Sequence, residues 1–219
     1  MPRDRENPAE RIDPFKESSR ERRLERDEAP GIIEGIEAES NPYMRGAFWL
    51  LLLTGARRTE VLSARWEHID LEAQEWTIPE TKSDRTHTLP LVPTAVDVLE
   101  SLPRQKGNPH VFCGRKDGQH LVNIDKAWRR IKKRADVDGL RVHDLRRTVA
   151  SWLADLGHSE YIIKRVLNHS VPDITGVYAR VGFDPIRDAL TQYAEQLLSL
   201  VAGDGDKVVS LADVRSEGA

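Results

Sequence analysis

Two arginines, two histidines, one lysine and one tyrosine stand in an order that could serve a single anionic ligand. They are Arg57, Lys82, His143, Arg146, His169 and Tyr178. The spacing of three between His143 and Arg146, near the start of a predicted helix, places both side chains on one helix face. A helix N-terminus adds unpaired N–H groups and a positive dipole end. We therefore expect this face to bind an anion.

Taken singly, each of these residues also has an ordinary structural explanation. Arg57, with Glu60 three residues later, could form a surface ion pair, and Lys82 could be a solvated hairpin lysine. His143 could cap a helix beside a surface arginine. Tyr178 could be a half-buried aromatic residue with a hydrogen-bonded hydroxyl. Only the order and spacing of the whole set distinguish a functional site from these alternatives.

The elements that must position these residues are mostly helices. Short alternating runs with turn-forming residues between them, within residues 66–92, predict a small antiparallel sheet of three strands. Val111-Phe112 is a candidate for a further, isolated strand. We expect a mainly α domain with one three-stranded antiparallel sheet, an α+β fold. Apolar periodicity predicts helices from near Gly31, over 42–54, through Glu60–Leu62, and over about 93–102, 123–134, 143–156, 159–167 and 185–201.

Composition is that of one ordinary domain with tails: 219 residues, 32% charged and 39% hydrophobic. The longest apolar run, 47–54, is far too short to span a bilayer, and no charged-then-apolar leader opens the chain. The single cysteine, Cys113, excludes an internal disulfide and a multi-cysteine metal site. We expect a cytoplasmic protein without a membrane segment.

Charge is unevenly distributed along the chain, although the net charge is only −3. Residues 80–150 hold 15 Lys and Arg against 9 Asp and Glu, whereas residues 1–40 hold 8 against 12 and residues 181–219 hold 3 against 7. A basic middle between acidic ends is typical of a nucleic-acid-binding face. The alternative is that the basic run 126–134 is the solvated face of a helix.

The local sequences around the six residues resemble those of the tyrosine recombinases of the phage-integrase family. Residues 54–60, Thr-Gly-Ala-Arg-Arg-Thr-Glu, resemble the first arginine box, and Thr81-Lys82 before Thr88-Leu-Pro-Leu91 resembles the lysine hairpin. Residues 142–148 resemble the His-x-x-Arg box, and 167–178 resemble the final segment with its tyrosine. The resemblance covers residues 41–200 or so, and all six positions occur in the family's order.

The resemblance implies a role for each residue in breaking a DNA strand without a metal or a cofactor. Tyr178 would attack phosphorus and hold the strand as a 3′-phosphotyrosyl ester, and His143 would assist removal of its proton, since free tyrosine has a pKa of about 10. The planar forks of Arg57 and Arg146 would bind the non-bridging phosphate oxygens. Lys82 would protonate the departing 5′ oxygen.

The same resemblance implies supporting residues around this set. His169 would donate a further hydrogen bond to the phosphate, and Glu60 would hold the helix of Arg57 or another group of the site. Further cations are expected to contact the DNA backbone; they are Arg85, Lys126, Arg129, Arg130, Lys133 and Arg147.

Neighbouring residues compete for some of these assignments. Leu156-Gly-His158-Ser matches the family's usual histidine motif better than Leu167-Asn-His169-Ser does, but only His169 lies nine residues before Tyr178, the family's interval. We therefore interpret His158 as a loop residue between helices. Asn168 in place of glycine is a mild departure that should leave the chemistry untouched. Arg58 and Arg147 adjoin the two arginines but do not fit the spacing of the two boxes.

Family members usually carry a helical DNA-binding domain before the catalytic one. We expect residues 1–29 to be a linker or arm after such a domain, 30–201 to be the catalytic domain and 202–219 a C-terminal tail. The chain would then be the C-terminal portion of a longer integrase, with weak, salt-sensitive DNA binding of its own. The apolar stripe of the last helix should dock on its own core, or alternatively on a neighbouring subunit.

The favoured function is a site-specific recombinase of a prophage or genomic island. Its partners would be double-stranded attachment sites, other protomers in a tetramer on DNA and accessory DNA-bending proteins, with no membrane. Two alternatives stay open: a type IB topoisomerase, which uses the same chemistry without site specificity, and a catalytically silent DNA-binding module. The intact set of six residues argues against the silent module.

Overall fold

The computed structural model describes residues 22–79, 86–169 and 183–202. Within these residues the chain forms eight α-helices, one short 3-10 helix and three strands. In chain order they are α1 (Ala29–Glu37), α2 (Pro42–Thr54), α3 (Arg58–Leu62), η1 (Trp66–His68), β1 (Ile69–Asp70), β2 (Glu75–Ile78), β3 (His87–Pro90), α4 (Pro93–Glu100), α5 (Asp125–Arg134), α6 (Val142–Asp155), α7 (Glu160–Val166) and α8 (Phe183–Ala202). The predicted mainly α fold with a small sheet is confirmed.

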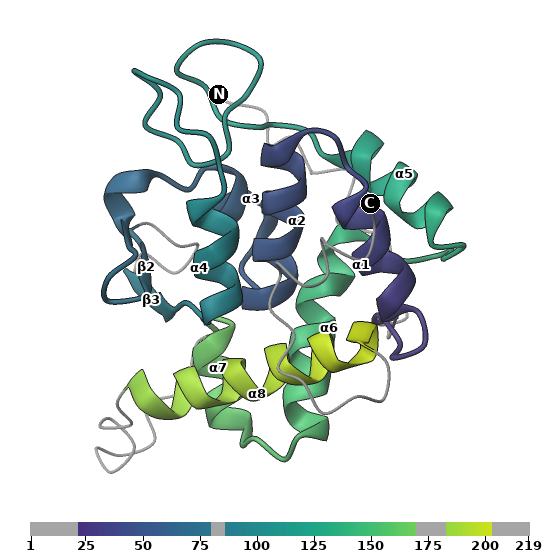
Figure 1. Ribbon diagram of the computed structural model, residues 1–219. Helices are drawn as coiled ribbons and strands as arrows, with labels where there is room; N and C mark the ends of the chain where they lie inside the picture. The colour runs from purple at the N-terminus through teal and green to yellow at the C-terminus, as the bar shows by residue number, and fades with distance from the viewer. Residues whose placement is uncertain (1–21, 80–85, 170–182, 203–219) are drawn as a thin grey trace, which may run out of the picture.

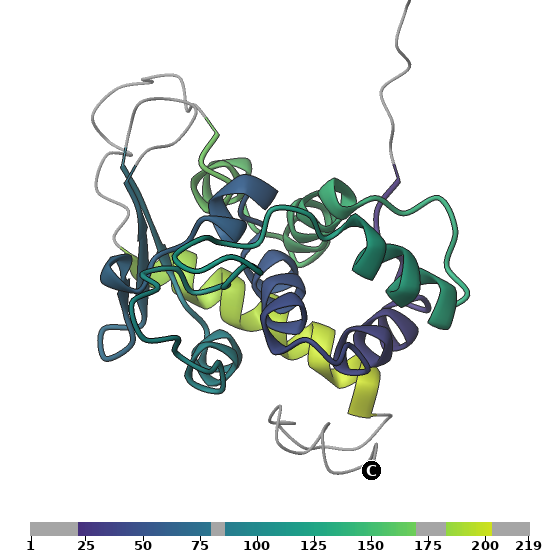
Figure 2. The same ribbon diagram turned by 90° about the horizontal axis from the view of Figure 1, so that it is seen from above.

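Helix α2 forms the centre of the molecule, with the sheet and α4 on one side and α1 and α5 on the other (Figures 1 and 2). The side chain of Asn41 caps its start by accepting hydrogen bonds from the N–H groups of Tyr43 and Met44, at 2.9 and 3.3 Å. Gly55 ends the helix in the left-handed region, at φ 63°. A Cβ there would lie 3.0 Å from Leu167 and 3.1 Å from Val149. Glycine therefore lets the chain turn closely against α6 before Arg57.

The sheet has the order β1-β2-β3, and both pairs of strands are antiparallel. Trp76 and Ile78 face the core, while Glu75 and Thr77, which alternate with them, face the other side. The last pair of the β2–β3 ladder is Ile78 with His87. The predicted sheet is confirmed, but the prediction of an isolated strand at Val111-Phe112 is wrong. Val111 and Phe112 are buried in a loop between two single bridges, Arg65 with His110 and Cys113 with His120.

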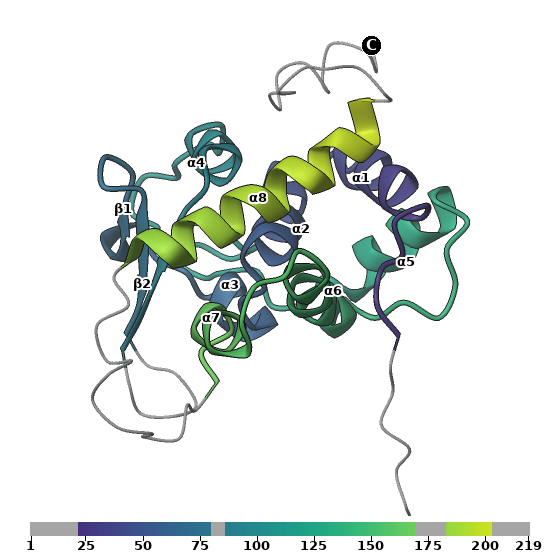
Figure 3. The same ribbon diagram turned by 90° about the horizontal axis from the view of Figure 1, so that it is seen from below.

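Helices α6 and α8 cover α2 from below. The predicted core positions of α6, Leu145, Val149 and Leu153, are fully buried. Helix α8 runs from the sheet past α7 and α6 to α1 (Figure 3). Its apolar stripe is buried on this domain, and the hydroxyl of Tyr193 donates to the carbonyl of Leu52 at 3.0 Å. Docking of the last helix on its own core is therefore confirmed. No helix in the described ranges has the length and apolar content needed to cross a membrane.

The segment before α1 is attached to α6. Leu24 is fully buried; its N–H donates to the Thr148 hydroxyl at 2.8 Å, and its carbonyl accepts from the Trp152 indole at 3.2 Å. Arg26 lies over the Trp152 ring. Packing thus begins inside the predicted arm of residues 1–29, of which 1–21 lie outside the described residues. The proposed domain boundaries stay a prediction.

Candidate active site

Arg57 is fixed at the start of α3 by Glu60. Its backbone is extended, with φ −69° and ψ 147°, so that α3 begins at the next residue. Its backbone N–H donates to one carboxylate oxygen of Glu60 and its Nη1 donates to the other, both at 2.7 Å. The Glu60 side chain is only 8% exposed. Glu60 therefore caps the helix and orients the guanidinium group.

Arg146 lies in the first turns of α6 and is buried. Its Nη1 donates to the carbonyl of Gly55 at 2.6 Å and its Nη2 to the carbonyl of Leu167. Burial, followed by the charge of Arg57, lowers the pKa of Arg146 to about 10, and Glu60 opposes the shift. Arg146 is thus still a cation at neutral pH. Because it is buried, its charge interacts more strongly with a nearby anion than it would in water.

The turn after α7 binds both arginines through its backbone. The Leu167 carbonyl accepts from Arg146, and the Asn168 carbonyl accepts from Nη2 of Arg57 at 3.4 Å. Asn168 has φ 49°, in the left-handed region that favours glycine, which explains why the family uses glycine here. Asn168 adopts this conformation and contacts the site through its carbonyl.

His143 and His169 lie beside these two arginines. Both side chains are exposed, His143 in the first turn of α6 and His169 after α7. Partial burial, then Arg146, lowers the pKa of each; Arg57 contributes to both shifts, and His143 itself to that of His169. Both imidazoles are therefore neutral at neutral pH and can accept or donate a proton.

The structure thus brings together four of the six predicted catalytic residues and Glu60. The remaining two, Lys82 and Tyr178, lie outside the described residues, as does Arg85 of the predicted DNA contacts. The arrangement of the four can bind an oxyanion with two guanidinium groups and two imidazoles, which is what charge development on a phosphate requires.

Sequence reasoning missed His87, which lies at the start of β3. Burial lowers its pKa to about 4; the Val166 carbonyl and Glu60 favour the protonated ring, while Arg165 and Arg146 disfavour it. The signal was present in the strand pattern, because side chains two apart share a face of a strand. His87 shares the face of Leu89, which is buried.

The predicted DNA-contacting cations divide into two groups. Lys126, Arg129 and Lys133 are exposed on α5, opposite its buried residues. Arg130 instead binds the buried carboxylate of Glu39 with two hydrogen bonds, at 3.0 and 2.6 Å. The predicted DNA contact of Arg130 thus stays a prediction, and its observed contact is within the chain.

Two arginines near the motifs, Arg147 and Arg58, have side-chain partners of their own. Arg147 pairs with Asp144 at 3.4 Å. Arg58 pairs with Asp125 at 2.7 Å, which links α3 to the start of α5. His158 lies between α6 and α7, as predicted for a loop residue.

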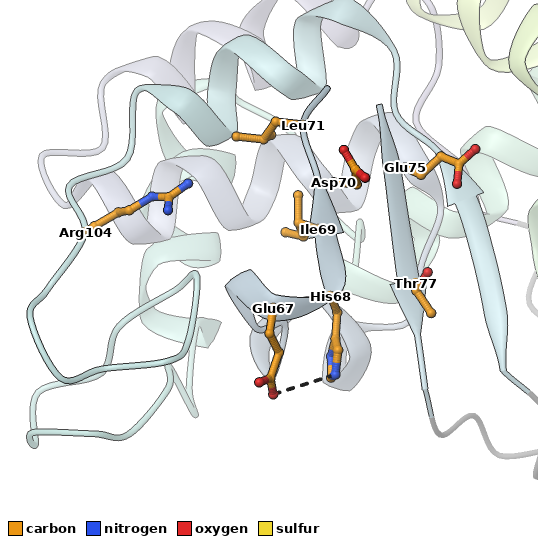
Figure 4. A pocket seen from close by; sticks show the side chains of 8 residues that line it. All are labelled: Glu67, His68, Ile69, Asp70, Leu71, Glu75, Thr77 and Arg104. Carbon is orange, nitrogen blue, oxygen red and sulfur yellow. Dashed lines mark ion pairs between the residues drawn. The ribbon is translucent and has the colours of Figure 1, made fainter. Parts of the chain in front are cut away.

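A separate pocket of about 640 Å³ lies on the outer side of the sheet (Figure 4). It is lined by the carboxylates of Glu67, Asp70 and Glu75, together with His68 and Arg104. Glu75 faces away from the core, so this pocket opens on the opposite face of β2 from Trp76. Three carboxylates repel a phosphate, which makes this pocket unsuitable for a nucleic-acid backbone. No group of three or more His, Cys, Asp or Glu within the described ranges is arranged to hold a metal ion.

Comparison with known proteins identifies the family of the chain. The model of the phage integrase family matches residues 22–184. The chain is 32% identical over 186 residues to prophage integrase IntZ of Escherichia coli K12, covering 82% of this chain and 46% of that protein. It is 30% identical over 203 residues to the integrase of Salmonella phage P22, covering 85% and 50%. The chain therefore spans about half the length of these curated relatives.

Solved structures show the same fold. The integrase of mycobacterium phage Brujita matches with a TM-score of 0.63 at 20% identity, over 87% of this chain and 66% of that one. The XerA recombinase matches with a TM-score of 0.60 at 23% identity, over 78% and 64%. Together with the arginine, histidine and glutamate geometry, the match over residues 22–184 establishes that this chain belongs to the phage integrase family.

Proposed function

We propose that this chain is the catalytic part of a site-specific DNA recombinase, the integrase of a prophage or genomic island. The observation that carries the proposal is the pair of guanidinium groups, Arg57 and Arg146, both bound to carbonyls of the turn before His169. Membership of the phage integrase family supports the same reaction.

In this proposal the Tyr178 hydroxyl oxygen attacks the scissile phosphorus, and the bond from phosphorus to the 5′ oxygen breaks. His143 takes up the tyrosine proton, for which its lowered pKa is suited because the neutral ring is available. Lys82 gives a proton to the departing oxygen. The products are a 3′-phosphotyrosyl ester and a free 5′ hydroxyl, and attack by another 5′ hydroxyl rejoins the strand.

Arg57, Arg146 and His169 bind the non-bridging oxygens in this scheme. Two forked cations on one phosphate stabilise the negative charge that develops during attack. Their own anchors, Glu60 and the backbone carbonyls, are in place before DNA binds, so little reorganisation is needed.

The proposed partner is double-stranded DNA at an attachment site. Lys126, Arg129 and Lys133, one to two turns apart on the exposed side of α5, are suited to contact successive phosphates. A lambda integrase dimer bound to a COC′ core site has the same fold, with a TM-score of 0.54 at 19% identity. By analogy we propose assembly of several protomers on DNA, up to a tetramer, with accessory DNA-bending proteins, in the cytoplasm.

A nicked suicide substrate tests the reaction. The DNA carries the junction sequence of the mobile element and a nick near the cut site, so that cleavage traps the protein covalently. We expect an adduct with the wild type and with Tyr161→Phe, and none with Tyr178→Phe. Absence of a wild-type adduct, even from the full-length protein, would contradict the proposal and favour the silent DNA-binding module. Relaxation of supercoiled plasmids that lack the site would instead favour the topoisomerase.

A further inference from the structure

A buried carboxylate just after α1 binds two arginines of α5. Glu39 lies two residues beyond the end of α1, and its side chain is only 1% exposed. Arg130 donates to it from Nε at 3.0 Å and from Nη2 at 2.6 Å, and Arg134 donates from Nη1 at 2.9 Å. Both carboxylate oxygens therefore accept hydrogen bonds from guanidinium groups of one neighbouring helix.

The two helices approach each other closely enough to bury this carboxylate. Helices α1 and α5 pack side by side (Figure 3). A Cβ at Gly35 would lie 2.9 Å from the carbonyl oxygen of Ile131, which is closer than packing allows. Arg134 also donates to the Gly35 carbonyl, at 3.3 Å. Glycine at this position thus permits the close approach, four residues before Glu39.

Arg130 and Arg134 lie on the same side of α5 as the proposed phosphate contacts. Lys126, Arg130 and Arg134 are spaced by four residues, so they form one row along the helix. Arg129 and Lys133 form the neighbouring row. The side chains of Arg130 and Arg134 remain 51% and 41% exposed although they bind Glu39. Without the carboxylate, both arginines could therefore turn towards DNA.

The Glu39 carboxylate binds Arg130 in the way that a phosphate would. Carboxylates and phosphates both accept two parallel hydrogen bonds from the planar guanidinium group, and Arg130 donates such a pair to Glu39. Transfer of the arginines to DNA would leave the Glu39 charge buried without a partner, which is strongly unfavourable. Both arginines should therefore stay on Glu39 when DNA binds.

We propose that Glu39 limits the DNA contacts of α5, because its carboxylate occupies Arg130 and Arg134 in place of phosphates. The other cations of the exposed side remain available. Sequence-independent affinity rises with each phosphate contact, and a genome offers many competing sites, so fewer contacts hold the protein less firmly at the wrong ones. The inference rests on the proposed function above, because it concerns the same DNA-binding helix.

Three variants separate this role from a purely structural one. Glu39→Gln removes the charge and keeps the size of the side chain. Glu37→Gln is the matched control, because it removes the same charge at the end of α1, where the carboxylate accepts from the Trp49 indole and lies 4.0 Å from Arg45. The third variant combines Glu39→Gln with glutamine at both arginines. A purely structural contact predicts that Glu39→Gln weakens DNA binding, whereas the proposal predicts that it strengthens it.

The measurement is the binding of each variant to a short duplex of unrelated sequence as the salt concentration is varied. The Tyr178→Phe background prevents a covalent adduct. We expect Glu39→Gln to bind more tightly at low salt, with a slope of log affinity against log salt steeper by about 2, since each phosphate contact contributes about 0.9. Glu37→Gln and the combined variant should keep the wild-type slope. A wild-type or shallower slope for Glu39→Gln would overturn the proposal, as would an equal steepening in either of the other two.

Arg134→Gln provides the test if Glu39→Gln does not fold. It leaves both hydrogen bonds between Arg130 and Glu39 in place. The slope should be that of the wild type, because Arg134 is already withheld from DNA. A slope shallower by about 1 would show that Arg134 contacts a phosphate, and the proposal would then be wrong.

The suicide substrate distinguishes failure of this inference from failure of the proposed function. A wild-type adduct together with an unchanged salt slope for Glu39→Gln would overturn the inference alone. Absence of any adduct, together with the expected steepening, would contradict the recombinase reaction and still support the role of Glu39 in DNA binding.

Discussion

Glu60 binds Arg57 twice, with one carboxylate oxygen on the backbone N–H and the other on the guanidinium, both at 2.7 Å. The Glu60 side chain thereby caps the start of α3 and orients Arg57, which is predicted to bind the phosphate. The nearly complete burial of Glu60 means that water replaces neither interaction easily.

Glu60→Ala should therefore lower both stability and activity. Loss of a cap at a helix start costs about 1 kcal/mol, which urea unfolding measures. Cleavage should slow in addition, because Arg57 loses its anchor. Glu60→Gln keeps an acceptor for the Arg57 N–H, so it should recover more of the stability than of the cleavage rate. Equal recovery of both would argue against a separate role in aiming Arg57.

Arg146→Lys should abolish most of the cleavage. An ammonium group cannot bind the Gly55 and Leu167 carbonyls in the same forked geometry, nor two phosphate oxygens at once. We expect a rate about 100-fold lower or more in the suicide-substrate assay. Arg58→Lys, on a neighbouring arginine that pairs with Asp125, is the control and should cleave normally. Equal rates in the two variants would contradict the assigned role.

Asn168 offers a test of backbone strain. Its positive φ costs glycine no steric strain but strains alanine. Its side-chain amide nitrogen is buried without a hydrogen-bond partner in the described part of the chain. Asn168→Gly should be at least as stable as the wild type. Asn168→Ala should be about 1 kcal/mol less stable than the glycine variant by denaturant unfolding. An alanine variant as stable as the glycine variant would show that φ is not restrictive here.

Stability should fall as the pH is lowered through the histidine range. The His87 pKa is about 4 in the folded protein, below its usual 6.5, so the unfolded chain takes up its proton first. The free energy of unfolding should therefore be unaffected by this group above pH 6.5 and fall by about 2 kcal/mol by pH 5. His143 and His169 act in the same direction. Urea titrations of the wild type and His87→Gln should give a shallower pH dependence for the variant, and identical slopes would disprove the assignment.

The two kinds of cation on α5 should respond differently to alanine. Arg129→Ala should weaken DNA binding and reduce the slope of log affinity against log salt by about 1, if it contacts one phosphate. Arg130→Ala should leave that slope unchanged and lower the thermal unfolding midpoint, because buried Glu39 would keep only Arg134, at 2.9 Å. A reduced salt slope for Arg130→Ala would show that it reaches DNA after all.

The fold class and the family follow from local sequence patterns alone. These patterns are the helix periodicity, the alternating runs of 66–92 and the ordered motifs. Each can be recognised in the sequence without knowing how the elements pack.

The tertiary structure alone decided which polar groups are partners. Arg130 and Glu39 are 91 residues apart in sequence, and Arg57 and Asn168 are 111 apart. Such pairs depend on how α1 packs on α5 and how the start of α3 meets the turn after α7, which no periodicity encodes. The sequence named Arg57 and Arg146 as phosphate ligands, but only packing revealed the carbonyl turn that holds them both.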